Sequence, residues 1–261
     1  MNSDDFNPVR NTQGDLKYSK QLLEDSLKVI NENTDSLKKK GIELLYLIAP
    51  NKETIYKEKL PESVEIYSEK TRTDDLIEYL ARDNSVDNLV YPKDELLKAK
   101  EQHQIYWKQD THWNEVGAGV AFRVILEKFR IDYKYEDAIS FRDEEYDGDL
   151  TKMLNMEGFF EDRAPRVDIG AGSDDYVVSY DSGKKGIIVS SNNSAVVRKN
   201  ILIVGDSYRD ALSNYCYRVF EKCIILHRND YDASLLDKYK IDFVVSEFVE
   251  RYIPRIRDQD L

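Results

Sequence analysis

Short apolar runs recur along the chain and predict the strands of a buried sheet. The runs are rich in β-branched and aliphatic residues, and each is short enough to be a strand rather than a helix. The five runs span residues 42–48, 86–90, 201–204, 223–226 and 241–245.

Segments between these runs carry apolar residues at helical spacing. In the first segment, Leu23, Leu27, Ile30 and Leu37 follow this spacing, and Gly41 supplies a C-terminal cap. The expected helices cover residues 15–40, 61–82, 114–129, 208–220 and 233–239. Strands that alternate with helices form parallel βαβ units. We therefore expect an α/β fold with a doubly wound parallel sheet of about five strands.

The stretch at about residues 131–200 interrupts this alternation. It is rich in Asp, Glu and Gly, and it contains two possible hairpin strands at residues 176–180 and 186–190. Residues 181–185 would form the connecting turn. We expect residues 1–261 to form a single domain in which the stretch at about 131–200 is an insert.

Charge and hydropathy exclude several classes of protein. The 261 residues include 38 Lys and Arg against 50 Asp and Glu, a formal net charge of −12. Such a chain repels the phosphates of nucleic acids and anionic lipids. It also lacks the run of ~20 apolar residues that a membrane-spanning helix needs. The first residues do not resemble a secretory signal, which fits both a cytoplasmic protein and an exported one whose signal lies outside this sequence.

The segment Gly205-Asp206-Ser207 directly follows one of the expected strands. In open α/β sheets, ligands bind beyond the carboxyl ends of the strands. Ser207 would stand at a sharp turn from strand to helix, where its own backbone N–H could hold a tetrahedral oxyanion. Asp and Ser are also ordinary helix caps. The nucleophile interpretation therefore requires a base that activates the hydroxyl group.

The chain has three histidines that could be this base: His103, His112 and His227. On an extended segment, residues i and i+2 point to the same side, so the Asp110 carboxylate could orient the His112 ring. We expect His103 to be a solvated surface residue. His227 follows an expected strand but has no carboxylate in register, and it ranks second as the base.

Nothing in the sequence indicates a metal or a nucleotide cofactor. The histidines are scattered, and Cys216 and Cys223 fall on apolar positions where small core residues are expected. The glycine-rich patterns GxGxxG and GxxxxGK[ST] are both absent. We expect neither thiol chemistry nor a cofactor.

Several segments together resemble the alginate-type polysaccharide O-acetyltransferases, a family with an SGNH-hydrolase-like, flavodoxin-like catalytic domain. The resemblance covers about residues 42–252. Its segments are Pro50-Asn-Lys52-x-x-Ile55-Tyr56 followed by Leu60-Pro61, Asp110-Thr-His112-Trp-Asn, Gly148-Asp149-Leu150, Gly205-Asp206-Ser207 and Glu247-Phe-Val-Glu250-Arg251.

The resemblance implies a role for each matching residue. The nucleophile falls on Ser207, the general base on His112 and the orienting acid on Asp110. Ordinary SGNH enzymes add an oxyanion-hole Gly and Asn, but His227-Arg228-Asn229 and Ser246-Glu247 stand at those places here. Asn229 and Arg228 are therefore candidate oxyanion donors beside the Ser207 backbone, and Tyr208 is a candidate substrate contact.

The resemblance also implies the setting of the reaction. The acceptor would be an extracellular polysaccharide, and the acetyl donor would act through a membrane-bound O-acyltransferase on the outer side of the membrane. Two alternatives stay open at this point. One is a carbohydrate acetylesterase with the same triad, in which water is the acceptor. The other is a non-catalytic glycan-binding or scaffold protein of exopolysaccharide assembly.

Overall fold

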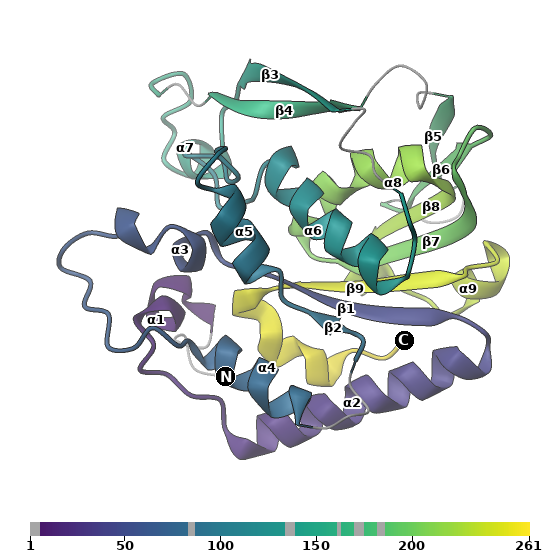
Figure 1. The fold of residues 1–261 in the computed structure, drawn as a ribbon, viewed down its shortest axis with the longest axis horizontal. Coiled ribbons are helices and arrows are strands. Elements are labelled where there is room, and N and C mark those ends of the chain that lie inside the picture. The colour runs from purple at the N-terminus through teal and green to yellow at the C-terminus, as the bar shows by residue number, and fades with distance from the viewer. Residues whose placement is uncertain (1–5, 83–86, 134–138, 161–162, 170–174, 182–185) are drawn as a thin grey trace.

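Seven strands form one central sheet in the order β2-β1-β9-β7-β8-β6-β5 (Figure 1). A computed structural model describes residues 6–82, 87–133, 139–160, 163–169, 175–181 and 186–261. The sheet strands are β1 (Glu43–Ala49), β2 (Leu89–Val90), β5 (Tyr176–Tyr180), β6 (Ile188–Asn192), β7 (Val197–Gly205), β8 (Phe220–His227) and β9 (Phe243–Val249). Strands β2, β1, β9, β7 and β8 pair in parallel. The five parallel strands expected from the apolar runs are confirmed.

The parallel strands are apolar because both faces of the sheet are covered by helices. Every residue of β9 is buried. One face packs against α5 (Lys93–Ala99), α6 (Glu115–Lys128) and α8 (Ser213–Val219). The other face packs against α2 (Lys20–Lys39), α4 (Arg72–Ala81), α9 (Ser234–Lys238) and the 3-10 helix η6 (Glu250–Asp258), as Figure 1 shows. This is the doubly wound α/β arrangement.

Two helices differ from the periodicity that predicted them. Helix α4 begins at Arg72, not near residue 61, because Thr71 and Asp74 form a capping box that starts the helix there. The segment expected to be one helix over residues 208–220 is a 3-10 helix, η4 (Ser207–Leu212), followed by α8. The remaining short helices are α1 (Pro8–Gln13), α3 (Lys52–Ile55), η2 (Lys57–Lys59), α7 (Asp149–Met153) and η5 (Arg228–Asp230).

The expected hairpin is present, and it extends the central sheet. Strands β5 and β6 pair antiparallel, and β6 also pairs antiparallel with β8. The connecting residues 182–185 lie outside the described residues. A separate two-stranded sheet is formed by β3 (Ile139–Glu145) and β4 (Arg163–Ile169). The interrupting stretch therefore contributes β6 and the edge strand β5 to the main sheet, and the division into one domain with an insert stays a prediction.

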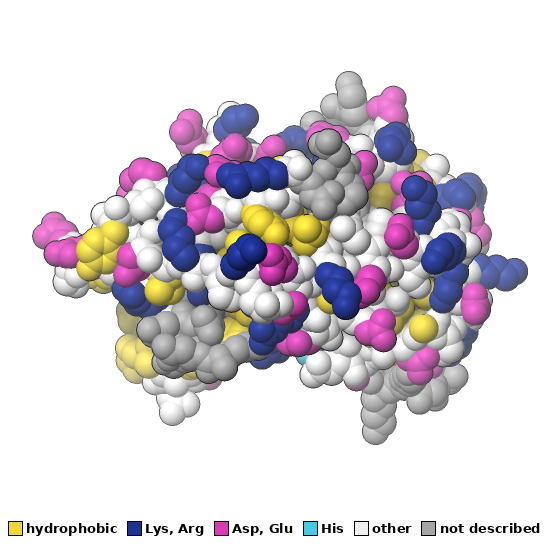
Figure 2. Space-filling model, turned by 90° about the horizontal axis from the view of Figure 1, so that it is seen from below, with side chains coloured by type: hydrophobic (Ala, Val, Ile, Leu, Met, Phe, Trp, Pro, Cys, Tyr) yellow, Lys and Arg dark blue, Asp and Glu magenta, His cyan; other side chains and the backbone are white. Residues whose placement is uncertain are grey.

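Surface charge is mixed on the face that lies below the sheet. Figure 2 shows Lys and Arg side chains interspersed with Asp and Glu side chains there, together with small groups of hydrophobic side chains. Within the described ranges, no helix is both long and apolar enough to span a bilayer. The carboxyl ends of β7, β8 and β9 lie next to one another, because these strands are parallel neighbours. The segments that follow them therefore meet at one edge of the sheet.

Candidate active site

Ser207 lies where β7 leads into η4, as the sequence predicts. Gly205 ends the strand, and Asp206 caps the helix by accepting the Tyr208 backbone N–H at 3.1 Å. A side chain at Gly205 would collide with Glu247. Ser207 is the first residue of the helix, so its backbone N–H has no intrahelical acceptor.

The structure connects the side chains of Ser207, His112 and Asp110 in a chain of hydrogen bonds. Ser207 Oγ lies 2.6 Å from His112 Nε2, and His112 Nδ1 lies 2.6 Å from Asp110 Oδ1. The side chain of His112 is 24% exposed and that of Asp110 is 2% exposed. A ring that donates from Nδ1 to the carboxylate leaves Nε2 free to accept the serine proton.

Asp110 accepts three further hydrogen bonds that hold its carboxylate in place. They come from the His112 backbone N–H at 2.9 Å, the Tyr146 hydroxyl at 2.8 Å and the Asp149 backbone N–H at 3.0 Å. Burial alone would raise the pKa of Asp110, but the hydrogen bonds from His112, Tyr146 and Asp149 outweigh burial and hold the pKa well below its usual value. Asp110 is therefore an anion at neutral pH.

Asp149 braces the segment that carries His112. Its carboxylate accepts the Thr111 backbone N–H at 2.9 Å and the Thr111 hydroxyl at 2.6 Å. The preceding Gly148 packs directly on the Gln109 carbonyl group, where a side chain would not fit. Sequence reasoning gave no role to Asp149 or Tyr146, although Gly148-Asp149-Leu150 is one of the segments that carry the family resemblance.

Lys52 and Tyr208 hold the same segment from other sides. Lys52 Nζ donates to the carbonyl groups of Lys108 and Asp110, at 2.7 and 3.0 Å. The Tyr208 hydroxyl donates to the Thr111 carbonyl group, and the Trp113 indole N–H donates to the Tyr208 carbonyl group at 2.9 Å. Tyr208 is fully buried, and its ring lies 4.8 Å from the His112 ring. Its hydroxyl therefore orients the histidine segment, while its side chain forms part of the cleft wall.

The cleft that contains Ser207 has a volume of about 520 Å³. Another pocket, of about 620 Å³, lies elsewhere on the molecule. Trp107 and Tyr146 stack with their ring centroids 4.0 Å apart on one wall of the cleft. Glu115, Arg166, Asp210 and Asn214 supply polar groups, and burial raises the pKa of Asp210. Because Trp107 is buried, the ring available on this wall is that of Tyr146, and an aromatic ring beside polar side chains suits a hydroxylated ring such as a sugar.

The other candidate residues do not line this cleft. His103 is exposed and lines a neighbouring pocket with Lys52 and Tyr56, and this pocket shares Asp110 with the cleft of Ser207. The His227 ring nitrogen Nδ1 accepts the Asn229 backbone N–H, and burial lowers the pKa of His227. Arg228 and Asn229, named as candidate oxyanion donors, line the 620 Å³ pocket instead. The structure therefore does not bring these two side chains to the cleft of Ser207.

Two buried glutamates at the end of β9 accept hydrogen bonds from segments around the site. Glu247 accepts the Asp206 backbone N–H at 2.9 Å, and burial raises the pKa of Glu247 well above its usual value. Glu250 accepts hydrogen bonds from groups on α1, α3 and the end of β2, which ties these segments together. Its donors are the Asn51 backbone N–H, the Thr54 and Tyr91 hydroxyls and the Asn11 amide.

Among the described residues, Asp110, His112 and Asp149 form the one group whose side chains could share a metal ion. Their ligand atoms lie within 4.8 Å of one another. His112 Nδ1 and Asp110 Oδ1 already pair at 2.6 Å, and both Asp149 oxygens accept hydrogen bonds from Thr111. A metal ion would have to displace these bonds, so the arrangement fits an oriented imidazole better than a metal centre.

Comparison with known proteins shows the family of the chain. Residues 10–216 match the family model described as SGNH hydrolase-like domain, acetyltransferase AlgX. The probable alginate O-acetylase AlgJ of Pseudomonas syringae pv. tomato is 25% identical over 259 residues, which cover 90% of this chain and 63% of that protein. AlgJ of Pseudomonas putida is 29% identical over 158 residues, which cover 58% of this chain and 40% of that protein. The chain thus spans less than two thirds of the length of these relatives.

Solved structures share the fold. PatB1 of Bacillus cereus superposes with a TM-score of 0.68 at 15% identity, and the match covers 92% of both chains. The O-acetyltransferase domain of Pseudomonas putida AlgJ gives a TM-score of 0.60 at 17% identity, with 96% of this chain and 95% of that chain covered. The expected SGNH-hydrolase-like fold is confirmed. Since the family model matches most of the sequence, the chain belongs to the family of SGNH hydrolase-like acetyltransferase domains represented by AlgX.

Proposed function

We propose that the chain transfers acetyl groups to hydroxyls of an extracellular polysaccharide through an acetyl-serine intermediate. Ser207 is the nucleophile, His112 the general base and Asp110 the orienting acid. The observation that carries the proposal is the 2.6 Å contact between Ser207 Oγ and His112 Nε2, because a serine hydroxyl needs a base within hydrogen-bond reach. Membership in an acetyltransferase family supports the same reaction class.

In the first half-reaction, His112 Nε2 takes the Ser207 proton as Oγ attacks the acetyl carbonyl carbon. A new Oγ–carbon bond forms, and the carbonyl oxygen becomes an oxyanion. When the oxyanion collapses, the bond from the acetyl carbon to the donor breaks, and the leaving group takes the proton from His112. The Asp110 carboxylate stabilises the imidazolium that exists between these two steps.

In the second half-reaction, a sugar hydroxyl replaces Ser207 as the nucleophile. His112 Nε2 accepts the hydroxyl proton, and the sugar oxygen bonds to the acetyl carbon. The bond from the acetyl carbon to Oγ then breaks, and Ser207 recovers its proton from His112. The Ser207 backbone N–H is the oxyanion donor that we propose for both steps, since it has no acceptor within η4.

The wall of the cleft is the proposed acceptor surface. Tyr146, stacked on the buried Trp107, presents an aromatic ring, and its hydroxyl donates a hydrogen bond to Asp110. A sugar bound on this face would therefore lie next to the Ser207–His112 pair. The donor side requires a partner, for which we propose a membrane-bound O-acyltransferase that supplies acetyl groups outside the cytoplasm.

Water can act as acceptor in the same chemistry, and the 24% exposure of the His112 side chain favours some hydrolysis. Acetyl-oligosaccharide and free acetate should therefore be measured together, with p-nitrophenyl acetate as donor and neutral and uronic oligosaccharides as acceptors. We expect acetylated oligosaccharide, and mass spectrometry of quenched protein should find the acetyl group on the Ser207 peptide.

Acetate release without acetylation of any acceptor would instead favour the esterase. A wild-type protein that neither releases acetate nor carries acetyl on Ser207 would overturn the proposal and favour a binding or scaffold role. The Ser207→Ala variant is the control for labelling at other residues.

A further inference from the structure

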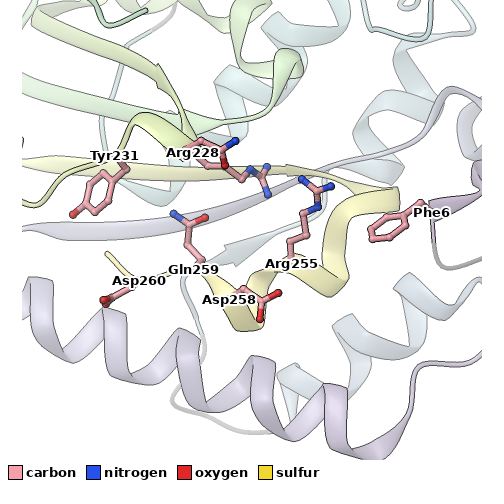
Figure 3. Close-up of a pocket in the computed structure, with 8 residues that line it drawn as sticks. Phe6, Arg228, Tyr231, Arg255, Asp258, Gln259 and Asp260 are labelled. Carbon is pink, nitrogen blue, oxygen red and sulfur yellow. The ribbon is translucent and has the colours of Figure 1, made fainter. Parts of the chain in front are cut away.

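A second pocket, of about 620 Å³, lies beyond the carboxyl end of β8, between η5 and η6. It shares no lining residue with the cleft of Ser207. Figure 3 shows that Arg228 and Arg255 reach toward one another from two sides of this pocket, with Phe6 beside Arg255. Two guanidinium groups that face one another repel unless an anion lies between them.

Arg228 has hydrogen-bond donors that the protein does not satisfy. Its side chain is 8% exposed, and it points into the pocket. Nη2 donates to Asp206 Oδ2 at 3.2 Å and to the Glu247 carbonyl group at 3.0 Å. Nε and Nη1 are buried and have no hydrogen-bond partner among the residues that the structure describes. Buried donors are rarely left unpaired, and those of a charged group least of all.

Arg255 supplies the second positive charge. It is exposed on η6, and its guanidinium stacks on the rings of Tyr252 and Phe6, at 4.5 and 5.5 Å from their centroids. Among the described residues, no carboxylate forms an ion pair with Arg255. The aromatic contacts fix the direction of the guanidinium and leave its N–H groups available for an oxyanion.

The other residues that line the pocket are polar, and their charges are distributed unevenly around it. Within the described part of the chain, the buried Tyr231 hydroxyl also has no hydrogen-bond partner, and Gln259 adds an amide group. Asp258 and Asp260 lie on the side of the pocket toward α2, away from the two guanidinium groups (Figure 3). The volume exceeds that of a single ion. A molecule with an oxyanion at one end and hydroxyl groups at the other matches this distribution.

We propose that this pocket binds a small oxyanion-bearing molecule, with the oxyanion held between Arg228 and Arg255 and its hydroxyl groups facing Tyr231 and Gln259. Phosphate and carboxylate groups share this chemistry. The site is separate from the proposed serine chemistry and does not depend on it. It touches the nucleophile turn through Arg228, because the Asp206 carboxylate bonded to Arg228 caps the helix that begins at Ser207.

The test is a calorimetric titration of the full chain at low ionic strength with inorganic phosphate, with gluconate as a hydroxylated carboxylate, and with chloride as the reference anion. We expect one site per chain for at least one of the two oxyanions, with a Kd of ~1 mM or tighter. The melting temperature should rise with that ligand and not with equal chloride. The ligand that binds more tightly shows whether the pocket prefers a phosphate or a carboxylate group.

Two variants on η6 test whether the binding seen in the titration occurs in this pocket. Arg255→Gln should weaken oxyanion binding at least about tenfold, because it removes one of the two charges. Arg257→Gln removes an equal charge from the same helix, where Arg257 lies outside the pocket and near Asp258, and it should bind like the wild type. Both side chains lie on the surface or partly so, and neither substitution is expected to unfold the chain.

Three results would overturn the proposal. The first is a wild-type protein with neither saturable heat nor a rise in melting temperature for either oxyanion. The second is unchanged affinity in Arg255→Gln. The third is an equal loss in Arg255→Gln and Arg257→Gln, which would indicate attraction to the general positive charge of η6 instead of a defined site.

Discussion

Ser207 and His112 are separated by 95 positions in the chain, yet their side chains meet at 2.6 Å. Neighbouring hydrogen bonds hold this contact from both sides. The Tyr208 hydroxyl binds the Thr111 carbonyl group, and the Trp113 indole binds the Tyr208 carbonyl group. The two segments are therefore fixed to one another by residues other than the pair itself, so either side chain can be removed without separating them.

Ser207→Ala and His112→Ala should each lower the rate of acetate release by roughly ten thousandfold or more, because the nucleophile or its base is lost. The rate is measured with p-nitrophenyl acetate, and circular dichroism checks that the fold is intact. His103→Ala is the matched control and should keep wild-type activity, since His103 is exposed and lies outside the cleft. Normal turnover in His112→Ala would assign the base to another residue.

Asp110→Asn should lower kcat by about a thousandfold or more, because a neutral amide can neither hold the Nδ1 tautomer firmly nor stabilise an imidazolium. The amide would also place an N–H donor where the carboxylate accepts three protein donors besides the His112 ring, namely the His112 and Asp149 backbone N–H groups and the Tyr146 hydroxyl. We therefore expect a fall in melting temperature as well. Kinetics and thermal unfolding are measured on the same sample. Full activity in a stable Asp110→Asn protein would contradict the orienting role.

Tyr146→Phe removes one donor from Asp110 and keeps the ring that stacks on Trp107. Loss of a hydrogen bond to a charged acceptor is worth about 1.5 kcal/mol, or roughly tenfold in rate if it acts on the transition state. We expect kcat to fall by about this factor while KM for an oligosaccharide acceptor changes little. Tyr180→Phe, at an exposed position on β5, is the control. A rise in KM with unchanged kcat would mean that the hydroxyl binds substrate instead.

The sequence predicts the parallel sheet well, because strands covered on both faces consist mostly of apolar residues. It predicts the start of α4 poorly, since the capping box at Thr71 and Asp74 determines where the helix begins. The pairing of β6 with β8 could not be foreseen from the hairpin residues, because the choice of a sheet edge depends on tertiary contacts.

The candidate site, too, could be predicted only in part from the sequence. The position after a strand singles out Ser207, and the spacing of an acid two residues before a histidine singles out Asp110-x-His112, but the distance between them depends on the whole topology. Asp149 is one of 50 acidic residues, and although it lies in a segment of the family resemblance, its contacts with Thr111 and Asp110 are visible only in the structure. The oxyanion roles of Arg228 and Asn229 stay predictions, and in the structure both residues line the pocket bounded by Arg255.

Glu247→Gln should change how stability depends on pH. Burial raises the pKa of Glu247, so the folded protein keeps this carboxyl group neutral at pH values where the unfolded chain, with a pKa of about 4.3, ionises it. The unfolded state then gains an advantage of ~1.4 kcal/mol for each pH unit above ~4.3, until the folded pKa is reached. Gln has the same shape, accepts the Asp206 N–H equally well and does not titrate.

The free energy of unfolding, measured in urea at pH 4.5, 6 and 8, should therefore shift in favour of Glu247→Gln as the pH rises. Glu221→Gln, at an exposed position on β8, is the control and should keep a nearly constant difference from the wild type. If the difference for Glu247→Gln were equally constant, Glu247 would be ionised in the folded protein. Its charge would then balance the nearby Arg228 guanidinium, and Arg228 would have less need of an external anion.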